Sequence, residues 1–334
     1  MFWDKNNNFA FVPVEDEEEL LYLYKIIYYE RDSIDYLRRY ANKKRKSSYY
    51  YFHLSDLHIG TRNVDVSKKR LKSLITKQIS ALEPDDNIDF IITGDAVDSP
   101  TKVNNYGYVD FSEFLESKSG KKPIFVLGNH DVNIKGLAFN HRNQRLANYV
   151  GNYPDIQIND EIKVIFLLFN SNTNGNFAEG EIGQQQMSEM GNILDNVTNL
   201  QEYKLVALLH HHVTSIETPG FYNEKWYEKI LSQRFIEQTL RLKDADIFLE
   251  WLKIRNVSLV LHGHKHIPYI CEHNGINIIA CGSSTGQVSH KEYGKTYLSY
   301  NVLKFNMDNV VCTQFAEELL GAGAKDIRTV IIEY

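Results

Sequence analysis

Short apolar runs recur along the chain from residue 48 onward, separated by longer segments of mixed polarity. The runs are rich in Val, Ile, Leu and Phe, and they have the length of β-strands rather than of helices. Polar residues follow each run, which indicates that the strand ends there in a loop. We expect strands at residues 49–54, 88–92, 123–127, 163–169, 204–209 and 258–261.

The segments between these strands carry apolar residues three and four positions apart, which is the spacing of an amphipathic helix. We expect helices over residues 64–82, 181–194 and 224–253. The last of these has two interpretations: a helix that covers the core, or a lid that shapes a substrate site. Strands that alternate with helices indicate a layered α/β core over residues 48–334.

Residues 1–47 differ from the rest of the chain and predict a helical N-terminal extension. Pro13 suits a first helical turn, and the acidic run 15–19 lies where a helix dipole favours negative charge. The basic run 43–46 is interpreted as a favourable helix end, with a contact to nucleic acid or another partner as the alternative. The tyrosines of the extension are expected to pack against the core or against a second copy of the chain, which would give a homo-oligomer.

Composition narrows the class of protein. The chain has 334 residues, 43% of them hydrophobic, which suits a sizeable core in one large domain or two smaller ones. The net charge of −6 provides no overall field that would attract nucleic acid. No apolar run approaches the ~20 residues of a membrane span, and the first residues lack a signal-peptide pattern. Three cysteines without CxxC spacing fit a reducing compartment, so we expect a soluble cytoplasmic protein with no membrane partner.

Side chains that often bind metals gather directly after five of the expected strands. Each cluster alone is ordinary, because Asp, Gly and His are common in loops. The carboxyl ends of the strands in an α/β sheet meet at one edge, so residues distant in the chain would come together there. The clusters are Asp56-x-His58, Gly94-Asp95-x-x-Asp98, Gly128-Asn129-His130-Asp131, His210-His211-His212 and His264-x-His266.

The residue types in these clusters suit one task. Carboxylate, imidazole and amide oxygen together bind first-row divalent metals such as Zn, Mn and Fe. The clusters offer more ligands than the roughly four that a single tetrahedral ion needs. We therefore expect two divalent ions that share one carboxylate, a device used for phosphoester hydrolysis. The identity of the metals stays open.

These blocks, in this order, resemble the motif set of the calcineurin-like metallophosphoesterase family: D-x-H, G-D-x-x-D, G-N-H-D, H and G-H-x-H. The resemblance extends from Asp56 to His266. It implies a four-layer α/β/β/α metallophosphoesterase sandwich, with two sheets face to face, that hydrolyses a phosphoester. The protein Ser/Thr phosphatase branch of the family has Arg after the second Asp and Glu after Gly-Asn-His. Ser99 and Asp131 stand at those positions here, which disfavours a phosphoprotein substrate.

The resemblance also implies a role for each matching residue. Asp95 corresponds to a carboxylate that bridges the two metal ions. His130 corresponds to the histidine that contacts the scissile phosphate and assists the leaving group, and Asp98 to the acid that orients this histidine. The other implied ligands form two sets: Asp56, His58 and His266 for one metal, and Asn129, His210 and His264 for the other.

The histidine triplet leaves one assignment open. His210 is the first residue after its strand and is the preferred ligand, with His211 as the alternative. Adjacent residues of a β-run face opposite ways, so one of these two is expected to point at the metals.

Three functions compete. The leading hypothesis is a phosphodiesterase that acts on a nucleotide-type diester, because the triplet resembles the cyclic-nucleotide phosphodiesterase branch. A metal-dependent DNA nuclease is the alternative, since residues 52–58 and Gly-Asn-His-Asp also resemble the double-strand-break nuclease branch. A non-catalytic scaffold with the same fold would be expected to lack ligands or His130, and the sequence retains them all.

Overall fold

The computed structural model of the chain describes residues 2–3, 9–10, 48–62, 64–132, 153–172, 179–215, 241–286, 288–289, 296–306, 309–318 and 325–333. The chain divides into two units, Met1–Ser48 and Tyr49–Tyr334. In the first unit, β1 (Phe2–Trp3) pairs antiparallel with β2 (Phe9–Ala10). The helices expected in residues 1–47 lie outside the described residues, so that extension stays a prediction.

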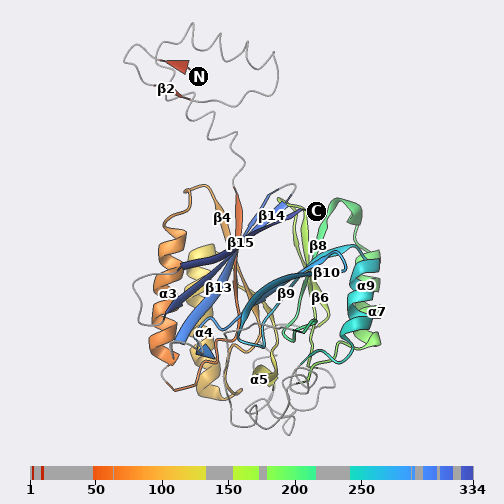
Figure 1. Ribbon diagram of the computed structural model, residues 1–334, viewed down its shortest axis with the longest axis horizontal. Helices are drawn as coiled ribbons and strands as arrows, with labels where there is room; N and C mark the ends of the chain where they lie inside the picture. Colours follow the sequence, from red (N-terminus) through yellow and green to blue (C-terminus); the bar gives the residue numbers. More distant parts are fainter. Residues whose placement is uncertain are drawn as a thin grey trace. The chain divides into compact units, whose positions relative to one another are not determined.

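Two β-sheets form the centre of the second unit (Figure 1). Neighbouring strands within each sheet are hydrogen-bonded in the orders given below. The first sheet runs β15 (Lys325–Glu333), β14 (Asn309–Glu318), β13 (Thr296–Phe305), β3 (Tyr49–Leu54), β4 (Asn87–Thr93) and β5 (Ile124–Val126), with β12 (Val288–Ser289) paired to β13. The second sheet runs β10 (Pro268–His273), β11 (Ile276–Cys281), β9 (Val257–His262), β8 (Lys204–Leu208), β7 (Val164–Leu168) and β6 (Asp155–Asn159).

Helices cover the outer face of each sheet. The helices α3 (Val64–Ile79) and α4 (Lys102–Ser119) pack on the first sheet, and α7 (Gln184–Asp195) and α9 (Ala245–Ile254) pack on the second (Figure 1). Buried side chains of each helix pair form one apolar cluster with the outer face of its sheet. In the part of the chain that the structure describes, no helix is long and apolar enough to cross a membrane.

A third apolar cluster lies between the two sheets. It joins inward side chains of the first sheet, such as Tyr51, to those of the second, such as Phe166, whose ring centroids are 4.8 Å apart. Burial of this inner layer and of both helix-covered faces removes large apolar areas from water, which is the main source of stability. The layers therefore run helix, sheet, sheet, helix, and the expected α/β/β/α architecture is confirmed.

Each strand expected from the apolar runs forms, with ends that shift by a residue or two. The prediction of a helix over residues 224–253 is wrong at Arg241–Asp244, where the backbone is not helical. There Leu242 donates its amide hydrogen to the carbonyl of His212, and Lys243 donates to Gly180. These bonds to distant loops replace helical ones, so α9 begins only at Ala245. Residues 216–240, and with them the choice between core cover and lid, lie outside the described residues.

Parallel strands bring the candidate ligands together. In the first sheet β3, β4 and β5 run parallel, and in the second β7, β8 and β9 do. Each of these strands ends in buried residues and passes into a polar loop. The carboxyl ends of β3, β4, β5, β8 and β9 thus carry the loops that hold the motifs.

Candidate metal centre

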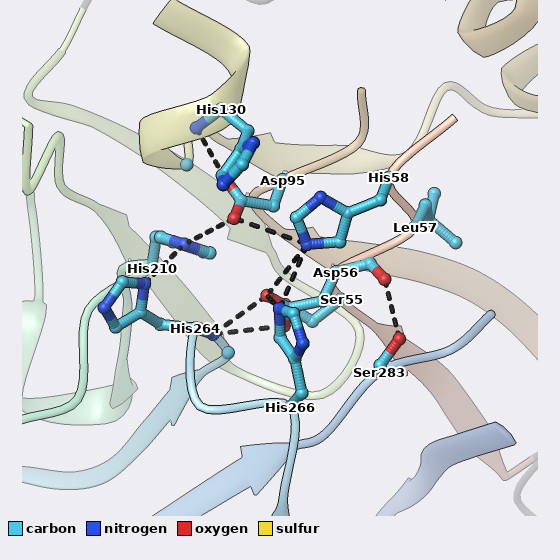
Figure 2. Close-up of polar contacts among 12 residues, drawn as sticks. Ser55, Asp56, Leu57, His58, Asp95, His130, His210, His264, His266 and Ser283 are labelled. Atoms are coloured by element: carbon cyan, nitrogen blue, oxygen red, sulfur yellow. Dashed lines mark hydrogen bonds and ion pairs between the residues drawn. The ribbon is translucent and has the colours of Figure 1, made fainter. Parts of the chain in front are cut away.

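The loops from both sheets meet in one buried cluster of carboxylates and imidazoles (Figure 2). The cluster takes its members from loops separated by up to about 200 residues of chain, as expected when strand ends share an edge. The first sheet contributes Asp56 and His58 after β3, Asp95 after β4, and Asn129 at the start of α5 (Asn129–Val132); the second contributes His210 after β8 and His264 and His266 after β9.

An unusual backbone conformation marks these loops. The φ angles are 51° at Asp56, 42° at His58, 50° at Asp95, 74° at His264 and 58° at His266. Residues other than glycine seldom adopt this left-handed region, which costs of order 1–3 kcal/mol each. Such strain persists only where the surrounding structure enforces it, and it gathers at functional sites.

Four side chains form the first group of metal-binding atoms: Asp56, His58, Asp95 and His266, with one atom from each lying within 4.8 Å of the others. His266 Nε2 lies 3.2 Å from Asp56 Oδ1, and His58 Nε2 lies 3.7 Å from Asp95 Oδ2. The Nε2 atoms of His58 and His266 are 3.0 Å apart. Two ring nitrogens this close, both facing carboxylates, suit a shared cation.

Asp95 also belongs to a second group, with His210 and His264. His210 Nε2 lies 3.3 Å from Asp95 Oδ2, 3.1 Å from Asn129 Oδ1 and 3.2 Å from His264 Nδ1. The other ring nitrogen of His210 lies 2.8 Å from the carbonyl of Thr93. A proton held on Nδ1 by that carbonyl leaves the Nε2 lone pair directed at the cluster, which is how metal-binding histidines are oriented.

Close packing fixes Asp95 between the two groups. Its Oδ1 accepts a hydrogen bond of 2.8 Å from the amide of His130. A Cβ added at Gly128 would lie 2.2 Å from both the amide nitrogen and Oδ1 of Asp95, so only glycine fits there. Two groups that share one carboxylate match the expected arrangement of two ions around a bridging aspartate.

The donor set fits divalent metal ions. The cluster combines carboxylate oxygens, imidazole nitrogens and one amide oxygen, which are ligands for Zn, Mn and Fe. His264 Nδ1 lies 3.2 Å from His210 Nε2, and His266 Nε2 lies 3.2 Å from Asp56 Oδ1, so each ring turns one nitrogen toward the cluster. His264 and its neighbours therefore have the chemistry of metal ligands.

Electrostatics of the buried groups agree with this chemistry. Burial opposes a charge on Asp95, but the positive charge available on His210 and His130 outweighs it and holds the pKa of Asp95 well below its usual value. Burial also opposes a charge on His210, yet the Asp95 carboxylate raises the pKa of His210 to about 9. Burial lowers the pKa of His58 to about 3, so this ring is neutral and able to bind a metal. The negative carboxylates of the cluster thus attract positive charge strongly.

His130 lies at the open side of the cluster. Its side chain is 24% exposed, whereas those of Asp95 and His210 are at most 2% exposed. The ring packs against His58, with the ring centroids 4.7 Å apart. His130 Nδ1 lies 2.8 Å from the backbone carbonyl of Asp98 and 4.0 Å from its carboxylate Oδ1. Asp98 thus contacts His130 most closely through its main chain.

The structure brings every site residue named from the sequence into or beside this cluster; their roles as ligands and catalysts stay predictions. His211 lies next to the cluster, but its Nδ1 is 2.7 Å from Ser171 Oγ. From the sequence, residues 281–284 could line the pocket, but no role was assigned to Ser283 or Thr285; in the structure both contact the backbone of the Asp56 loop. The signal was available, since Gly-Ser-Ser-Thr follows an apolar strand just as the other motifs do.

Alanine substitutions should separate the neighbouring histidines. We expect His210→Ala to lower the bound metal most, because His210 Nε2 faces Asp95 and Asn129 while His211 Nδ1 faces Ser171. Elemental analysis of the purified variants gives the metal stoichiometry, with His273→Ala, an exposed histidine on β10, as the control. A greater loss of metal in His211→Ala would contradict the assignment.

Similar solved structures include a dimetal phosphatase and a phosphopantetheinyl hydrolase. A dimetal phosphatase from Danio rerio matches with a TM-score of 0.54 at 11% identity, covering 86% of this chain and 99% of its own. A phosphopantetheinyl hydrolase from Mycobacterium tuberculosis matches with a TM-score of 0.44 at 14% identity, covering 71% of this chain and 91% of its own. At these identities the likeness concerns the fold alone.

Comparison of sequences gives the family. No curated protein matches the chain significantly. The family model described as calcineurin-like phosphoesterase matches residues 50–268. That span is more than half of the chain and contains all the blocks from Asp56 to His266. The chain belongs to the calcineurin-like phosphoesterase family.

Proposed function

We propose that the chain is a dinuclear metal-dependent phosphodiesterase that acts on a nucleotide-type phosphodiester. Membership of the family supports metal-dependent phosphoester hydrolysis in general. The observation that carries the dinuclear part is the position of Asp95, whose carboxylate belongs to both groups of metal-binding atoms. A bridging carboxylate holds two ions at the short separation that two-metal hydrolases use.

Divalent ions in such a site would polarise phosphoryl oxygens and lower the pKa of bound water to about 7. The chain's own residues supply the rest of the chemistry. The carboxylates and imidazoles would hold the ions, and their burial excludes bulk water from that side. In this proposal the ring of His130 donates a proton to the leaving oxygen as the P–O bond breaks and water adds to phosphorus.

Sparse positive charge supports a diester as substrate. A phosphate monoester carries about two negative charges at neutral pH and a diester carries one, so a monoester site gains more from added Arg or Lys. Within the motif segments and their flanks, the Arg and Lys side chains are Arg62 and Lys265; the segments are residues 55–62, 93–99, 128–131, 210–212 and 262–266. Arg62 is exposed to solvent, which weakens its field at the cluster.

Two chromogenic substrates test this preference. We expect a higher kcat/KM for bis(4-nitrophenyl) phosphate than for 4-nitrophenyl phosphate, measured with Mn²⁺, Fe²⁺ and Zn²⁺ in turn on the chelator-treated protein. A tenfold preference for the monoester would overturn the diester assignment. Full activity in the metal-stripped protein would overturn the metal-dependent reaction itself.

A DNA nuclease is the second candidate. The likeness of residues 52–58 to the double-strand-break nuclease branch favours it, but residues 52–54 lie in β3 with their side chains buried. The net charge of −6 gives no general attraction to DNA. Cleavage of linear duplex DNA faster than of small diesters would favour the nuclease. A non-catalytic scaffold is the least supported function, because no implied ligand is missing.

We place the protein in the cytoplasm. Cys271, Cys281 and Cys312 all lie in the described residues as free thiols, which suits a reducing compartment. A homo-oligomer formed through residues 1–47 stays a prediction.

A further inference from the structure

The loop after β11 lies directly behind the Asp56 loop. Ser283 Oγ donates a hydrogen bond of 2.9 Å to the backbone carbonyl of Asp56, as Figure 2 shows. Thr285 Oγ1 donates a bond of 2.8 Å to the carbonyl of Leu57. Ser284 adds a reciprocal pair with Ser55: its amide donates to the Ser55 carbonyl at 2.9 Å, and its Oγ accepts from the Ser55 amide at 3.1 Å.

The Asp56 loop needs this support because its backbone is strained. Asp56 and His58 both lie in the left-handed region, with φ of 51° and 42°. On one side, the amides of Asp56 and His58 donate to the carbonyls of Gly94 and Asp95, at 3.1 and 2.9 Å. The peptide bond between Leu57 and His58 is trans, so the Leu57 carbonyl points opposite to the His58 amide, away from the Asp95 carbonyl. Thr285 donates to this carbonyl and Ser283 donates to that of Asp56, so the strained turn is held from both sides.

The positions of the two hydroxyl groups indicate a role through the backbone rather than a contact with substrate. Ser283 and Thr285 are each 1% exposed. The carbonyl of Ser283 accepts a bond of 2.9 Å from the amide of Ser299 on β13, which anchors the loop to the first sheet. The hydroxyl of Thr285 donates to the Leu57 carbonyl in the Asp56 loop, and its side chain is buried. Neither side chain lies on the open side of the cluster, where His130 is exposed.

We propose that Ser283 and Thr285 are positioning residues that hold the Asp56-Leu57-His58 backbone in its metal-binding conformation. The proposal rests on the two-metal site of the proposed function. The two hydroxyls bond to the carbonyls of Asp56 and Leu57, in the backbone that joins the Asp56 and His58 side chains. Loss of these bonds would let this backbone relax toward ordinary φ values. Relaxation would move the Asp56 carboxylate and the His58 ring away from Asp95 and His266.

The test measures metal affinity directly, without turnover. The double variant Ser283→Ala, Thr285→Val removes both hydroxyls and keeps the side-chain volumes close to the original. We expect its affinity for Mn²⁺, measured by competition with a fluorescent chelator, to fall about 10–100-fold, as is usual when partners of metal ligands are removed. Thr285→Ser alone keeps the hydroxyl and should bind Mn²⁺ within about twofold of the unchanged protein. Thr285→Val alone should bind more weakly than Thr285→Ser.

A matched control is available in Thr214→Val. Thr214 is also buried, and its hydroxyl lies 3.9 Å from Cys271 Sγ rather than against the Asp56 loop. It should retain the affinity of the unchanged protein. Melting curves in excess chelator compare the stability of the metal-free folds. If the double variant does not fold, the comparison of Thr285→Val with Thr285→Ser decides the question.

The outcomes separate the two proposals. Absence of Mn²⁺ binding in the unchanged protein would overturn the metal centre. Tight binding by the unchanged protein together with equal binding by the double variant would overturn only the positioning role. An equal loss in Thr285→Val and Thr285→Ser would also overturn it, because the hydroxyl would then not be responsible.

Discussion

Replacing Asp95 by Asn should reduce kcat/KM by about 10²–10⁴-fold and remove most of the bound metal. Loss of several kcal/mol of charge stabilisation corresponds to this range, since each 1.4 kcal/mol is a factor of ten. Asp95 Oδ1 accepts the amide of His130 at 2.8 Å, and an asparagine oxygen would keep that bond. The amide nitrogen would then take the place of Oδ2, which faces both His58 and His210. A donor at that position cannot bind a cation, so both groups lose their shared ligand.

A matched substitution on the surface provides the control. Asp65 lies on α3, its side chain is 88% exposed, and it pairs with Lys68 at 3.3 Å. Asp65→Asn removes the same charge far from the cluster and should leave metal content and turnover unchanged. Metal content is measured by elemental analysis and turnover with bis(4-nitrophenyl) phosphate. Unchanged metal content in Asp95→Asn would show that Asp95 is not a bridging ligand.

The candidate site could be predicted from the sequence because its residues follow strands that are plain in the apolar pattern. β3, expected at residues 49–54, has those bounds in the structure, and Asp56 and His58 follow it. β8 ends at Leu208, close to the expected residue 209, and His210 follows. Strand ends that share one edge of a layered fold bring such residues together whatever their separation in the chain.

The elements that were not predicted are those whose formation depends on partners distant in the chain. β14 alternates buried and half-buried positions, but its pairing with β13 and β15 is what makes it a strand. The helix expected over residues 224–253 failed at Leu242, because that residue bonds to His212 instead of continuing a helix. Local propensity is a weak guide wherever tertiary contacts can offer alternative hydrogen bonds.

Contacts made by backbone carbonyls could not be predicted from the sequence either. Asp98 was expected to orient His130 with its carboxylate, whereas its backbone carbonyl lies nearer to the ring, at 2.8 Å. Ser283 likewise acts on the carbonyl of Asp56 and not on its side chain. A motif shows which side chains are present, but backbone contacts depend on the exact path of each loop.

Replacing His130 by Ala should lower kcat by about 10²–10⁴-fold for substrates with poor leaving groups while leaving the metal content intact. The ring is more exposed than those of His58 and His210, and its nearest polar contact is the Asp98 carbonyl. His130 lies outside both groups that share Asp95 and forms a separate group with His58 and Asp98. A proton donor matters only where the departing oxygen needs a proton.

Leaving-group dependence distinguishes this role from a structural one. Nitrophenolate departs without a proton, so the loss of kcat in His130→Ala should be small for bis(4-nitrophenyl) phosphate and large for an alkyl or nucleoside diester. His273→Ala, on exposed β10, is the control and should affect neither substrate. Asp98→Asn should cost less than His130→Ala, because the backbone carbonyl that holds the ring is unchanged by that substitution. An equal loss with good and poor leaving groups would remove the acid role from His130, since a displaced phosphate or a disturbed Asp95 slows both reactions alike.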